Sequence, residues 1–354
     1  MNKVFDAKKL LVDVFNPLKT DVVAFLIDLP HQTCADNEDW QDRRKMALEW
    51  HRAMRELALD RGFTVIPPVY FPATGINSGP LPDEIVQILR GCTLGIAMTE
   101  FSASGPLANL CKEDEILRVA SMPGVLRRME RSALGADYSI VQDRCRLLGK
   151  IMQDAVSCRV KFSSSSNHEC TFDLRFRDAH EDNGLLHFGK SGIINLPSGE
   201  VYKTPYEGEN SDEVSETNGY LPVTFNGETV IFEVRENKIV DVTGHMDGVR
   251  HFLAFFEADP ARRNIAECAF GVNDDAIVTG NVLEDEKAGF HWAYGLSTHL
   301  GGTVGPDAFN SPETQVHEDY VYAKESPIQV TSAVLIGKSG AEVVIIEDGE
   351  YVIF

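Results

Sequence analysis

The first 155 residues alternate between short apolar runs and amphipathic segments, and this alternation constrains the fold more than any other feature. Residues 22–28 (VVAFLID) form a continuous apolar run that ends in an acid and precedes Pro30, as expected of a strand buried on both faces. Residues 40–61 space their apolar side chains as a helix does and stop at Gly62. Buried strands that alternate with helices predict an α/β domain with a mostly parallel sheet.

The other elements expected in this half follow the same pattern. We expect strands at 63–70 and 92–98, helices at 81–89 and 137–153, and a loop that runs into a helix at 121–129.

From about residue 156 the strands become short and often alternate polar with apolar residues. We expect strands at 158–162, 171–176, 229–235 and 238–242, a helix at 246–258, and a hairpin from 328–337 and 343–354. Asn226-Gly227 and Glu236-Asn237 are turn signals between strands, and residues 206–217 form an acidic loop that we expect to be mobile. The sequence therefore predicts two domains, an α/β domain at 1–155 and an α+β domain rich in antiparallel strands at 156–354.

Charge and composition exclude several classes of function. With 33 Lys and Arg against 54 Asp and Glu, the net charge is −21, which repels nucleic acid and anionic membranes and is compatible with divalent cations. No apolar run approaches the roughly 20 residues that span a bilayer, and the charged N-terminus does not resemble a signal peptide. The seven cysteines are scattered without a C-x-x-C pair, and no glycine-rich nucleotide motif is present. We expect a cytoplasmic protein without a nucleotide cofactor.

His317 and Asp319 lie two positions apart in the segment VHEDYV. In a β-strand, residues i and i+2 point to the same face, so both side chains could contact one metal ion. Imidazole together with carboxylate suits Zn, Mn, Co or Fe. A surface His-x-Asp pair without a ligand is the alternative.

Three further side chains could complete a metal site. Glu200 follows a Pro-Ser-Gly turn, Glu267 lies between small and apolar residues, and His291 follows the acidic segment NVLEDEK. A glutamate between apolar residues, as Glu267 is, is costly to bury unless it is paired or bound to a metal. A glutamate at a strand edge that faces solvent would show the same sequence pattern. Three carboxylates with two histidines are about what two adjacent metal ions require when one carboxylate bridges them.

Several neighbouring residues are weaker candidates. His299, close to Gly301-Gly302, could act in catalysis on a flexible loop, and His187 could line the substrate pocket, although a packed strand histidine is the simpler interpretation. Lys287 could bind a substrate carboxylate or form a structural ion pair. Glu284 and Asp285 could orient His291 or lie on a surface turn. Cys268 is interpreted as a small core residue.

Four segments, NLPSGEVYKTP, NIAECAFGVN, NVLEDEKAGFHWAYG and VHEDYV, resemble in this order motifs of the thermophilic-type metalloaminopeptidases, the leucyl aminopeptidase-like aminopeptidase T/S family. The resemblance covers roughly residues 185–354. It implies an α/β domain followed by a metal-bearing domain, a homodimer, and two divalent ions (Zn, Co, Mn or Mg). It implies that the ligands are Glu200, Glu267, His291, His317 and Asp319, with Glu267 bridging the ions and acting in catalysis.

Two features depart from the family pattern. The family has a catalytic tyrosine shortly after the histidine that matches His291, whereas Tyr294 here precedes the glycine, and Thr298 or His299 could occupy the place. The chain also looks short for a peptidase and closer in length to a divergent branch, the 2,5-dihydroxypyridine dioxygenases, which hold one Fe(II) with two His and one Asp. That branch has His in place of Glu267 and lacks the acid after Pro-Ser-Gly, and this chain keeps both acids.

The sequence thus predicts a metal-dependent hydrolase of an amide or peptide-like C–N bond, acting on a small molecule or short peptide-like substrate. The first alternative is a mononuclear non-haem Fe(II) dioxygenase that cleaves the ring of a hydroxylated N-heterocycle. A catalytically inactive binding protein is the second.

Overall fold

The structure, a computed structural model, describes residues 5–164, 166–187, 191–210 and 212–354. It divides into two compact units, each made of three stretches of chain. The first unit comprises Met1–Asp143, Asp182–Gly199 and Asn273–Lys287; the second comprises Arg144–Glu181, Glu200–Val272 and Ala288–Phe354. The division at residue 155 expected from the sequence treats each domain as continuous, whereas residues 182–199 and 273–287 return to the first unit.

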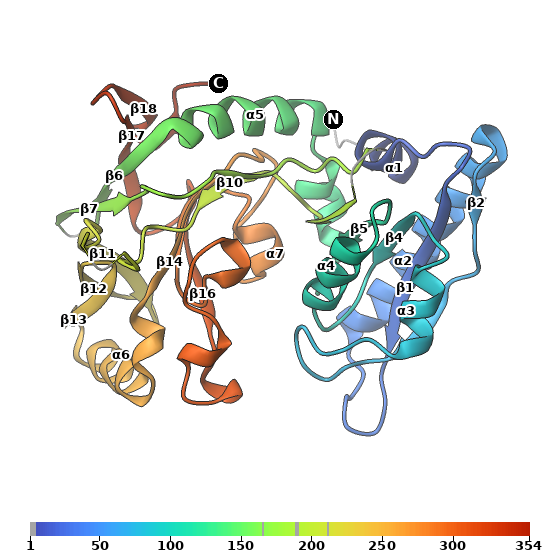
Figure 1. Cartoon of the computed structure of the whole chain (residues 1–354), viewed down its shortest axis with the longest axis horizontal. Coiled ribbons are helices and arrows are strands. Elements are labelled where there is room, and N and C mark those ends of the chain that lie inside the picture. Colours follow the sequence, from blue (N-terminus) through green and yellow to red (C-terminus); the bar gives the residue numbers. More distant parts are fainter. Residues whose placement is uncertain (1–4, 165, 188–190, 211) are drawn as a thin grey trace. The chain divides into compact units, whose positions relative to one another are not determined.

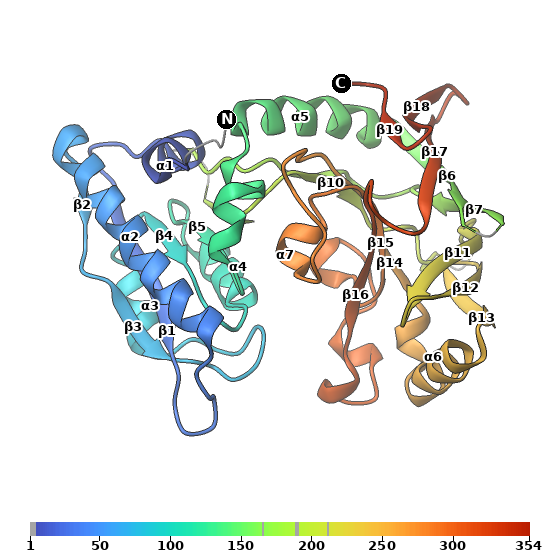
Figure 2. The ribbon, with the colours of Figure 1, turned by 180° about the vertical axis from the view of Figure 1, so that it is seen from behind.

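The first unit is built on a six-stranded parallel sheet with helices on both faces (Figures 1 and 2). Its strand order is β2-β1-β4-β5-β9, and β3 also pairs with β1. The strands are β1 Val22–Leu29, β2 Thr64–Val65, β3 Val69–Pro72, β4 Leu94–Ala97, β5 Arg118–Ser121 and β9 Gly192–Asn195. The main helices are α1 Ala7–Phe15, α2 Glu38–Arg61, α3 Asp83–Leu89 and α4 Ser104–Glu113.

The side chains of β1 alternate between two hydrophobic cores. Val23 and Phe25 pack in the core shared with α1 and α2, while Ala24 and Leu26 pack in the core shared with α3 and α4. Because β1 is buried on both faces, its sequence is apolar from Val22 to Ile27, and Asp28 near its end is also buried. The predicted α/β fold with a parallel sheet is confirmed.

Some predicted elements of this unit differ from the structure. The strand expected at 63–70 is two strands, β2 and β3, because Pro67-Pro68 supplies no N–H groups to the ladder. The helix expected at the end of 121–129 is a 3₁₀ turn, Arg127–Arg131. His187, expected in a strand, is exposed and lies in an irregular segment. Helix α4 and strands β5 and β9 were not expected.

The second unit contains an eight-stranded sheet in the order β13-β12-β11-β7-β6-β17-β18-β19. Its strands are β6 Ala155–Ser163, β7 Asn167–Asp173, β11 Asn218–Phe225, β12 Glu228–Arg235, β13 Lys238–Gly244, β17 Gln329–Gly337, β18 Glu342–Glu347 and β19 Glu350–Tyr351. Both turns expected from the sequence are present. Asn226 and Gly227 have φ of 51° and 82°, and Glu236 and Asn237 have 49° and 66°, the left-handed backbone that two-residue hairpin loops require.

A second sheet of this unit carries the candidate site. It has five strands in the order β16-β15-β14-β10-β8. They are β8 His180–Asp182, β10 Glu200–Lys203, β14 Ile265–Gly271, β15 Phe290–Gly295 and β16 His317–Tyr322. Trp292 and Tyr294 on β15 pack against Phe232 and Phe256, the latter from helix α6 (Met246–Ala258). One face of the sheet is therefore closed by an aromatic core, and the predicted domain rich in antiparallel strands is confirmed.

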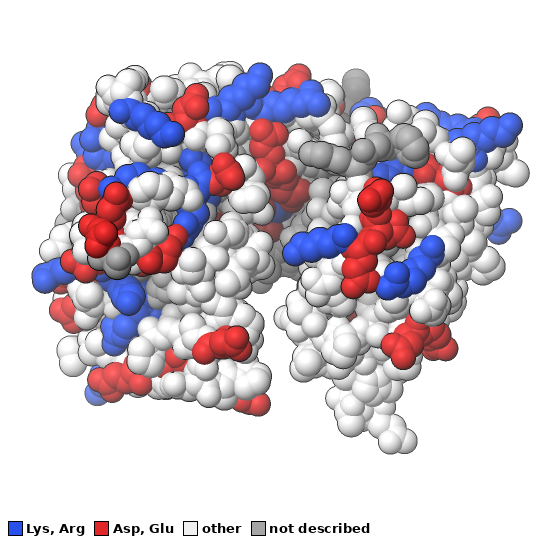
Figure 3. Space-filling model, viewed as in Figure 1, with Lys and Arg blue, Asp and Glu red and all other residues white. Residues whose placement is uncertain are grey.

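Two further features concern the charge on the surface and the hydropathy of the helices. On the face drawn in Figure 3, acidic and basic side chains are interspersed. None of the helices in the described ranges is long and apolar enough to cross a membrane.

Candidate metal centre

The register of four neighbouring strands places the five predicted ligands on one face of the five-stranded sheet. Ala293 pairs with Glu267 on one side and with Asp319 on the other. The same registers pair His291 with Ala269, Glu200 with Gly271 and His317 with Gly295. Each of these partners lies two or four residues along its strand from Glu267 or Ala293. Since residues two apart in a strand share a face, all five side chains point the same way. We call these five residues the ligand cluster.

The residues between the ligands on this face are small. On β14 they are Ala269 and Gly271, and on β15 they are Ala293 and Gly295. On the other face β15 carries the large side chains Phe290, Trp292 and Tyr294, and β14 carries Phe270. This alternation buries one face in the core and leaves the ligand face without large side chains of its own on these two strands.

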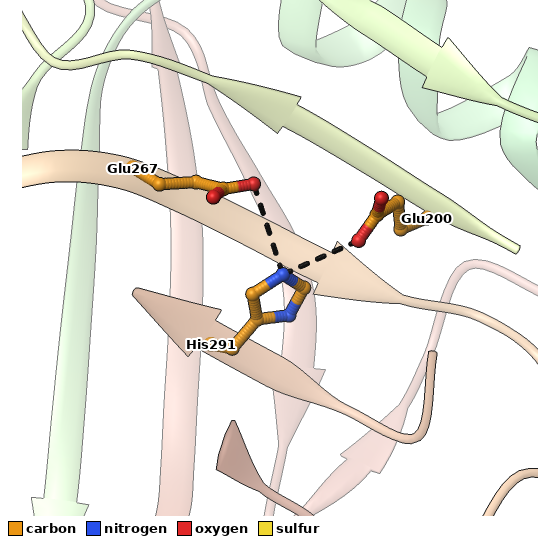
Figure 4. Close-up of side chains that lie close together, drawn as sticks. All are labelled: Glu200, Glu267 and His291. Atoms are coloured by element: carbon orange, nitrogen blue, oxygen red, sulfur yellow. Dashed lines mark ion pairs between the residues drawn. The ribbon is translucent and has the colours of Figure 1, made fainter. Parts of the chain in front are cut away.

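Glu267 lies at the middle of the ligand cluster, and its two carboxylate oxygens face different histidines. Oε1 lies 3.8 Å from Nε2 of His291, and Oε2 lies 3.1 Å from Nε2 of His317. His291 Nε2 also lies 3.4 Å from Oε2 of Glu200, as Figure 4 shows, and His317 Nε2 lies 3.7 Å from Oδ1 of Asp319. The donor atoms thus form two groups of three that share Glu267, each with one imidazole and one further carboxylate.

Backbone carbonyls orient both imidazoles. Nδ1 of His291 lies 3.2 Å from the carbonyl oxygen of Gly289, and Nδ1 of His317 lies 2.7 Å from that of Leu296. A carbonyl only accepts, so each Nδ1 carries the proton and donates it. This leaves each Nε2 directed at the carboxylates and able to ligate an ion, the arrangement in which proteins commonly hold metal-binding histidines.

The ligand cluster fits divalent ions. Ligand atoms about 2.0–2.1 Å from a tetrahedral ion lie roughly 3.3 Å from one another, and the spacings of 3.1–3.8 Å within each group are close to this. They are mostly longer than an ordinary N–H···O hydrogen bond. Among the described residues, no lysine or arginine contacts the buried carboxylate of Glu267. The residue types and their convergence therefore suit two ions that share one carboxylate.

Burial and the mutual proximity of these groups displace their pKa values. Burial raises the pKa of Glu267 above its ordinary value. Burial alone would lower the pKa of His291, but Glu200 and Glu267 outweigh it and raise that pKa to about 9. The imidazoles therefore hold protons between carboxylates, and a divalent ion competes with these protons because it needs a deprotonated Nε2.

His299 lies beside the ligand cluster. Its ring meets the ring of His317 edge to face, with the centroids 4.7 Å apart. Although the residue is exposed in part, desolvation of the imidazole, together with nearby His317, lowers the pKa of His299 to about 4, so this imidazole is neutral at pH 7. Thr298, the other residue considered for the place of the family tyrosine, is exposed next to it.

Tyr294 does not face the ligand cluster. Tyr294 lies three residues after His291 on β15, so its side chain points to the opposite face of the sheet. There its ring packs on Phe256 and its hydroxyl donates to Glu318 at 2.7 Å. Tyr294 is therefore not a residue of the ligand face.

The weaker candidates of the segment 281–287 lie in the first unit and have other partners. Glu284 is fully buried and accepts from Arg128, Ser132 and the backbone N–H of Ala133. Asp285 accepts from the N–H groups of Thr279 and Gly280. Both expectations for these acids were wrong, because they neither orient His291, whose Nδ1 bonds Gly289, nor lie on a surface turn.

Lys287 is fully buried and forms ion pairs with Asp182 and Glu286, as the structural interpretation of this lysine predicted. His187 is exposed, and its Nε2 contacts the carbonyl of Asp13 within the first unit. Cys268 is buried in the core of the second unit, as expected.

Sequence reasoning missed Glu207. Its side chain is 3% exposed and accepts hydrogen bonds from Ser297 and Thr303, in the loop that follows β15. Glu207 opens the run EGENSDE, which looks like solvated loop. The sequence offers one signal, the aromatic residue Tyr206 immediately before it, which the structure shows to be buried.

No protein-family model matches the chain, and no curated protein matches its sequence. Solved structures do resemble it. The 2,5-dihydroxypyridine dioxygenase of Pseudomonas putida KT2440 superposes with a TM-score of 0.64 at 15% identity, over 98% of this chain and 97% of that one. Wild-type AmpT of Thermus thermophilus superposes with a TM-score of 0.61 at 14% identity, over 99% of each chain.

At such low identity these likenesses show the fold alone. They support a distant relationship to the fold shared by both proteins and do not assign the chain to a specific family. The coverage also corrects one expectation. The chain is about as long as each neighbour, so its length does not favour the dioxygenase.

Proposed function

We propose that this protein is a metal-dependent hydrolase that cleaves an amide or peptide-like C–N bond with two divalent ions, of Zn, Co, Mn or Mg. The observation that carries the proposal is the position of Glu267, whose Oε1 faces His291 while Oε2 faces His317. A carboxylate with one oxygen directed to each of two ligand groups is what a bridging ligand requires. The resemblance of the sequence motifs to the aminopeptidase T/S family and the structural likeness to AmpT support the same reading.

Each group of the ligand cluster has a distinct place in this chemistry. Bound divalent ions supply Lewis acidity toward the substrate carbonyl and lower the pKa of a water molecule. Glu200 with His291, and Asp319 with His317, would hold one ion each. As the resemblance of the sequence motifs implies, Glu267 would also act in catalysis, taking the proton of the attacking water and returning it to the leaving amine.

His299 is a further group beside the ligand cluster that could contact a substrate. Its imidazole is neutral at pH 7 and lies against His317, so it could offer one donor or one acceptor to a substrate next to the ions. The substrate we propose is a small molecule or short peptide-like amide. As the sequence resemblance implies, we also propose that the protein is a homodimer.

A mononuclear Fe(II) ring-cleaving dioxygenase is the second candidate. It is favoured by the likeness to the 2,5-dihydroxypyridine dioxygenase and by the absence of Tyr294 from the ligand face. Against it stand Glu200 and Glu267, since more anionic ligands favour a second divalent ion over a lone Fe(II) with open positions for oxygen.

One experiment separates the two reactions. The metal-loaded protein is incubated under argon in ¹⁸O-labelled water with aminoacyl anilides, short peptides and small amides. A hydrolase releases an amine without oxygen, and the new carboxylate carries one label from water. Turnover that requires O₂, with product label that comes from the gas, would assign the dioxygenase reaction instead.

A further inference from the structure

The loop that follows β15 forms a small closed ring of hydrogen bonds. The Ser297 N–H donates to the Val304 carbonyl at 2.9 Å, and the Val304 N–H donates back to the Ser297 hydroxyl at 3.1 Å. The Gly302 N–H donates to the Ser297 carbonyl at 3.0 Å. A Cβ on Gly302 would lie 2.3 Å from the Ser297 hydroxyl, so only glycine fits there. Residues 297–304 therefore have a defined shape, and we call them the clamped loop.

One carboxylate holds the clamped loop from outside. Oε1 of Glu207 accepts from the hydroxyl of Ser297, and Oε2 accepts from both the backbone N–H and the hydroxyl of Thr303. Oε1 also accepts from the amide of Asn264 at 2.8 Å, and Arg177 lies 3.5 Å from Oε2. Because Glu207 is almost completely buried, these four hydrogen bonds and one cation stabilise a charge that would otherwise be costly to bury.

The residues that contact Glu207 adjoin the strands that carry the ligand cluster. Asn264 directly precedes β14, and its side-chain amide also donates to the carbonyl of Gly295 at the end of β15. The clamped loop begins one residue after Leu296, whose carbonyl receives the Nδ1 proton of His317 at 2.7 Å. The same loop carries His299. Glu207 itself lies four residues beyond the end of β10, the strand that begins with Glu200.

We propose that Glu207 is a positioning residue for the metal centre. By fixing the clamped loop to Asn264, it sets the place of the Leu296 carbonyl and so the direction of His317 Nε2, and it places His299 beside that imidazole. Glu207 is not itself one of the candidate metal ligands. The inference rests on the proposed function, because it concerns the same ligand cluster.

The test uses a change that keeps the shape of Glu207 and removes half of its acceptors. In Glu207→Gln, one oxygen becomes an NH₂ group, which would face two donors instead of accepting from them. We expect the affinity for the ion held by His317 and Asp319 to fall about 10-fold, the lower end of the range seen when an outer partner of a metal ligand is lost. Zn²⁺ affinity is measured by competition with a chromophoric chelator, so the readout does not depend on activity.

The chain offers a matched control for lost stability. Asp173 is also buried, pairs with Arg175, and accepts on both oxygens, from Arg175 and the N–H of Glu216. Asp173→Asn should lower the urea midpoint as Glu207→Gln does and leave Zn²⁺ affinity unchanged. Thr303→Val should weaken Zn²⁺ binding, and Thr303→Ser, which retains the hydroxyl, should restore it.

The outcomes separate this inference from the proposed function. Wild-type protein that binds no divalent ion would overturn both. Wild-type protein that binds ions, with equal Zn²⁺ affinities in Glu207→Gln and Asp173→Asn, would overturn the positioning role of Glu207 and leave the proposed function standing.

Discussion

Each unit of this protein buries a set of acids, and the two sets differ in what surrounds them. In the first unit, Glu284 accepts from Arg128 and Ser132, and Lys287 lies 3.3 Å from Asp182. We call these five residues the anchoring cluster. In the second unit, the ligand cluster sets three carboxylates around two imidazoles, and its central Glu267 contacts no lysine or arginine among the residues that the structure describes.

On this difference we separate the acids that stabilise the fold from the acids that we propose bind metal ions. In the anchoring cluster, cations and hydroxyl groups of the protein already compensate the buried charge, so nothing further is required. In the ligand cluster, the negative charges exceed the protons that two imidazoles supply at neutral pH, and an external cation would complete the compensation. The comparison predicts that mutations in the ligand cluster change metal binding, whereas mutations in the anchoring cluster change stability.

The largest effect is expected from His317→Ala and Asp319→Ala. Each removes one ligand, so the ion of that group should be lost and activity should fall below detection. Elemental analysis of dialysed protein measures the first effect, and circular dichroism in the presence of a chelator should show an unchanged fold. Full metal content in both variants would show that the ligand cluster does not bind the metal.

Glu267→Gln should have the next largest effect. The substitution keeps the shape of the side chain but removes its charge and basicity. We expect the rate to fall by roughly 10² or more, the scale of a lost general base, while some metal remains bound. The turnover numbers of the variant and the wild type are compared at saturating metal. A rate near that of the wild type would show that Glu267 has no role in catalysis.

Lys287→Met tests whether the anchoring cluster affects stability and leaves metal binding unchanged. It leaves Asp182 and Glu286 without this buried cation, so the free energy of unfolding should fall by about 3 kcal/mol. Urea denaturation measures the change, and Zn²⁺ affinity should stay at the wild-type value. A Lys287→Met variant that keeps its stability and loses its metal would reverse the roles of the two clusters.

The smallest effect concerns Lys203, on β10 but on the face opposite Glu200. It donates to the carbonyls of Gln153 and Ala155, and burial lowers its pKa to about 8. The unfolded chain retains this proton up to about pH 10.5, so Lys203 makes stability rise between pH 8 and 10.5. Below pH 8 both states carry the proton, and the contribution of Lys203 no longer changes with pH. Lys203→Met should flatten this rise in urea midpoints without changing metal content; an unchanged slope would exclude the lysine as its source.

Much of the site could be predicted because the signals are local. The i, i+2 spacing of His317 and Asp319 needs only a strand to place both on one face, and β16 provides it. Glu267 was conspicuous as an acid between apolar residues. The helix at 246–258 and the turn at Asn226-Gly227 also carry local patterns, and both are found as predicted.

The missed features depend on distant contacts. Strand β5 has only four residues and begins with Arg118, whose charge suggests a surface position until Asp21 is seen to pair with it in the core. Strand β9 joins the parallel sheet from residues 192–195, far along the chain from the other strands. Glu207 looks solvated in sequence, and its burial follows from donors about 90 residues away in the clamped loop.

Metal stoichiometry tests the central claim most directly. The protein is purified under argon, stripped with a chelator, reloaded with Zn²⁺ or Mn²⁺, and analysed for bound metal per chain together with oxygen uptake. The account predicts two ions per chain and no oxygen consumption, with Glu267 shared between the ions. One iron per chain with oxygen uptake, or no bound metal at all, would contradict it.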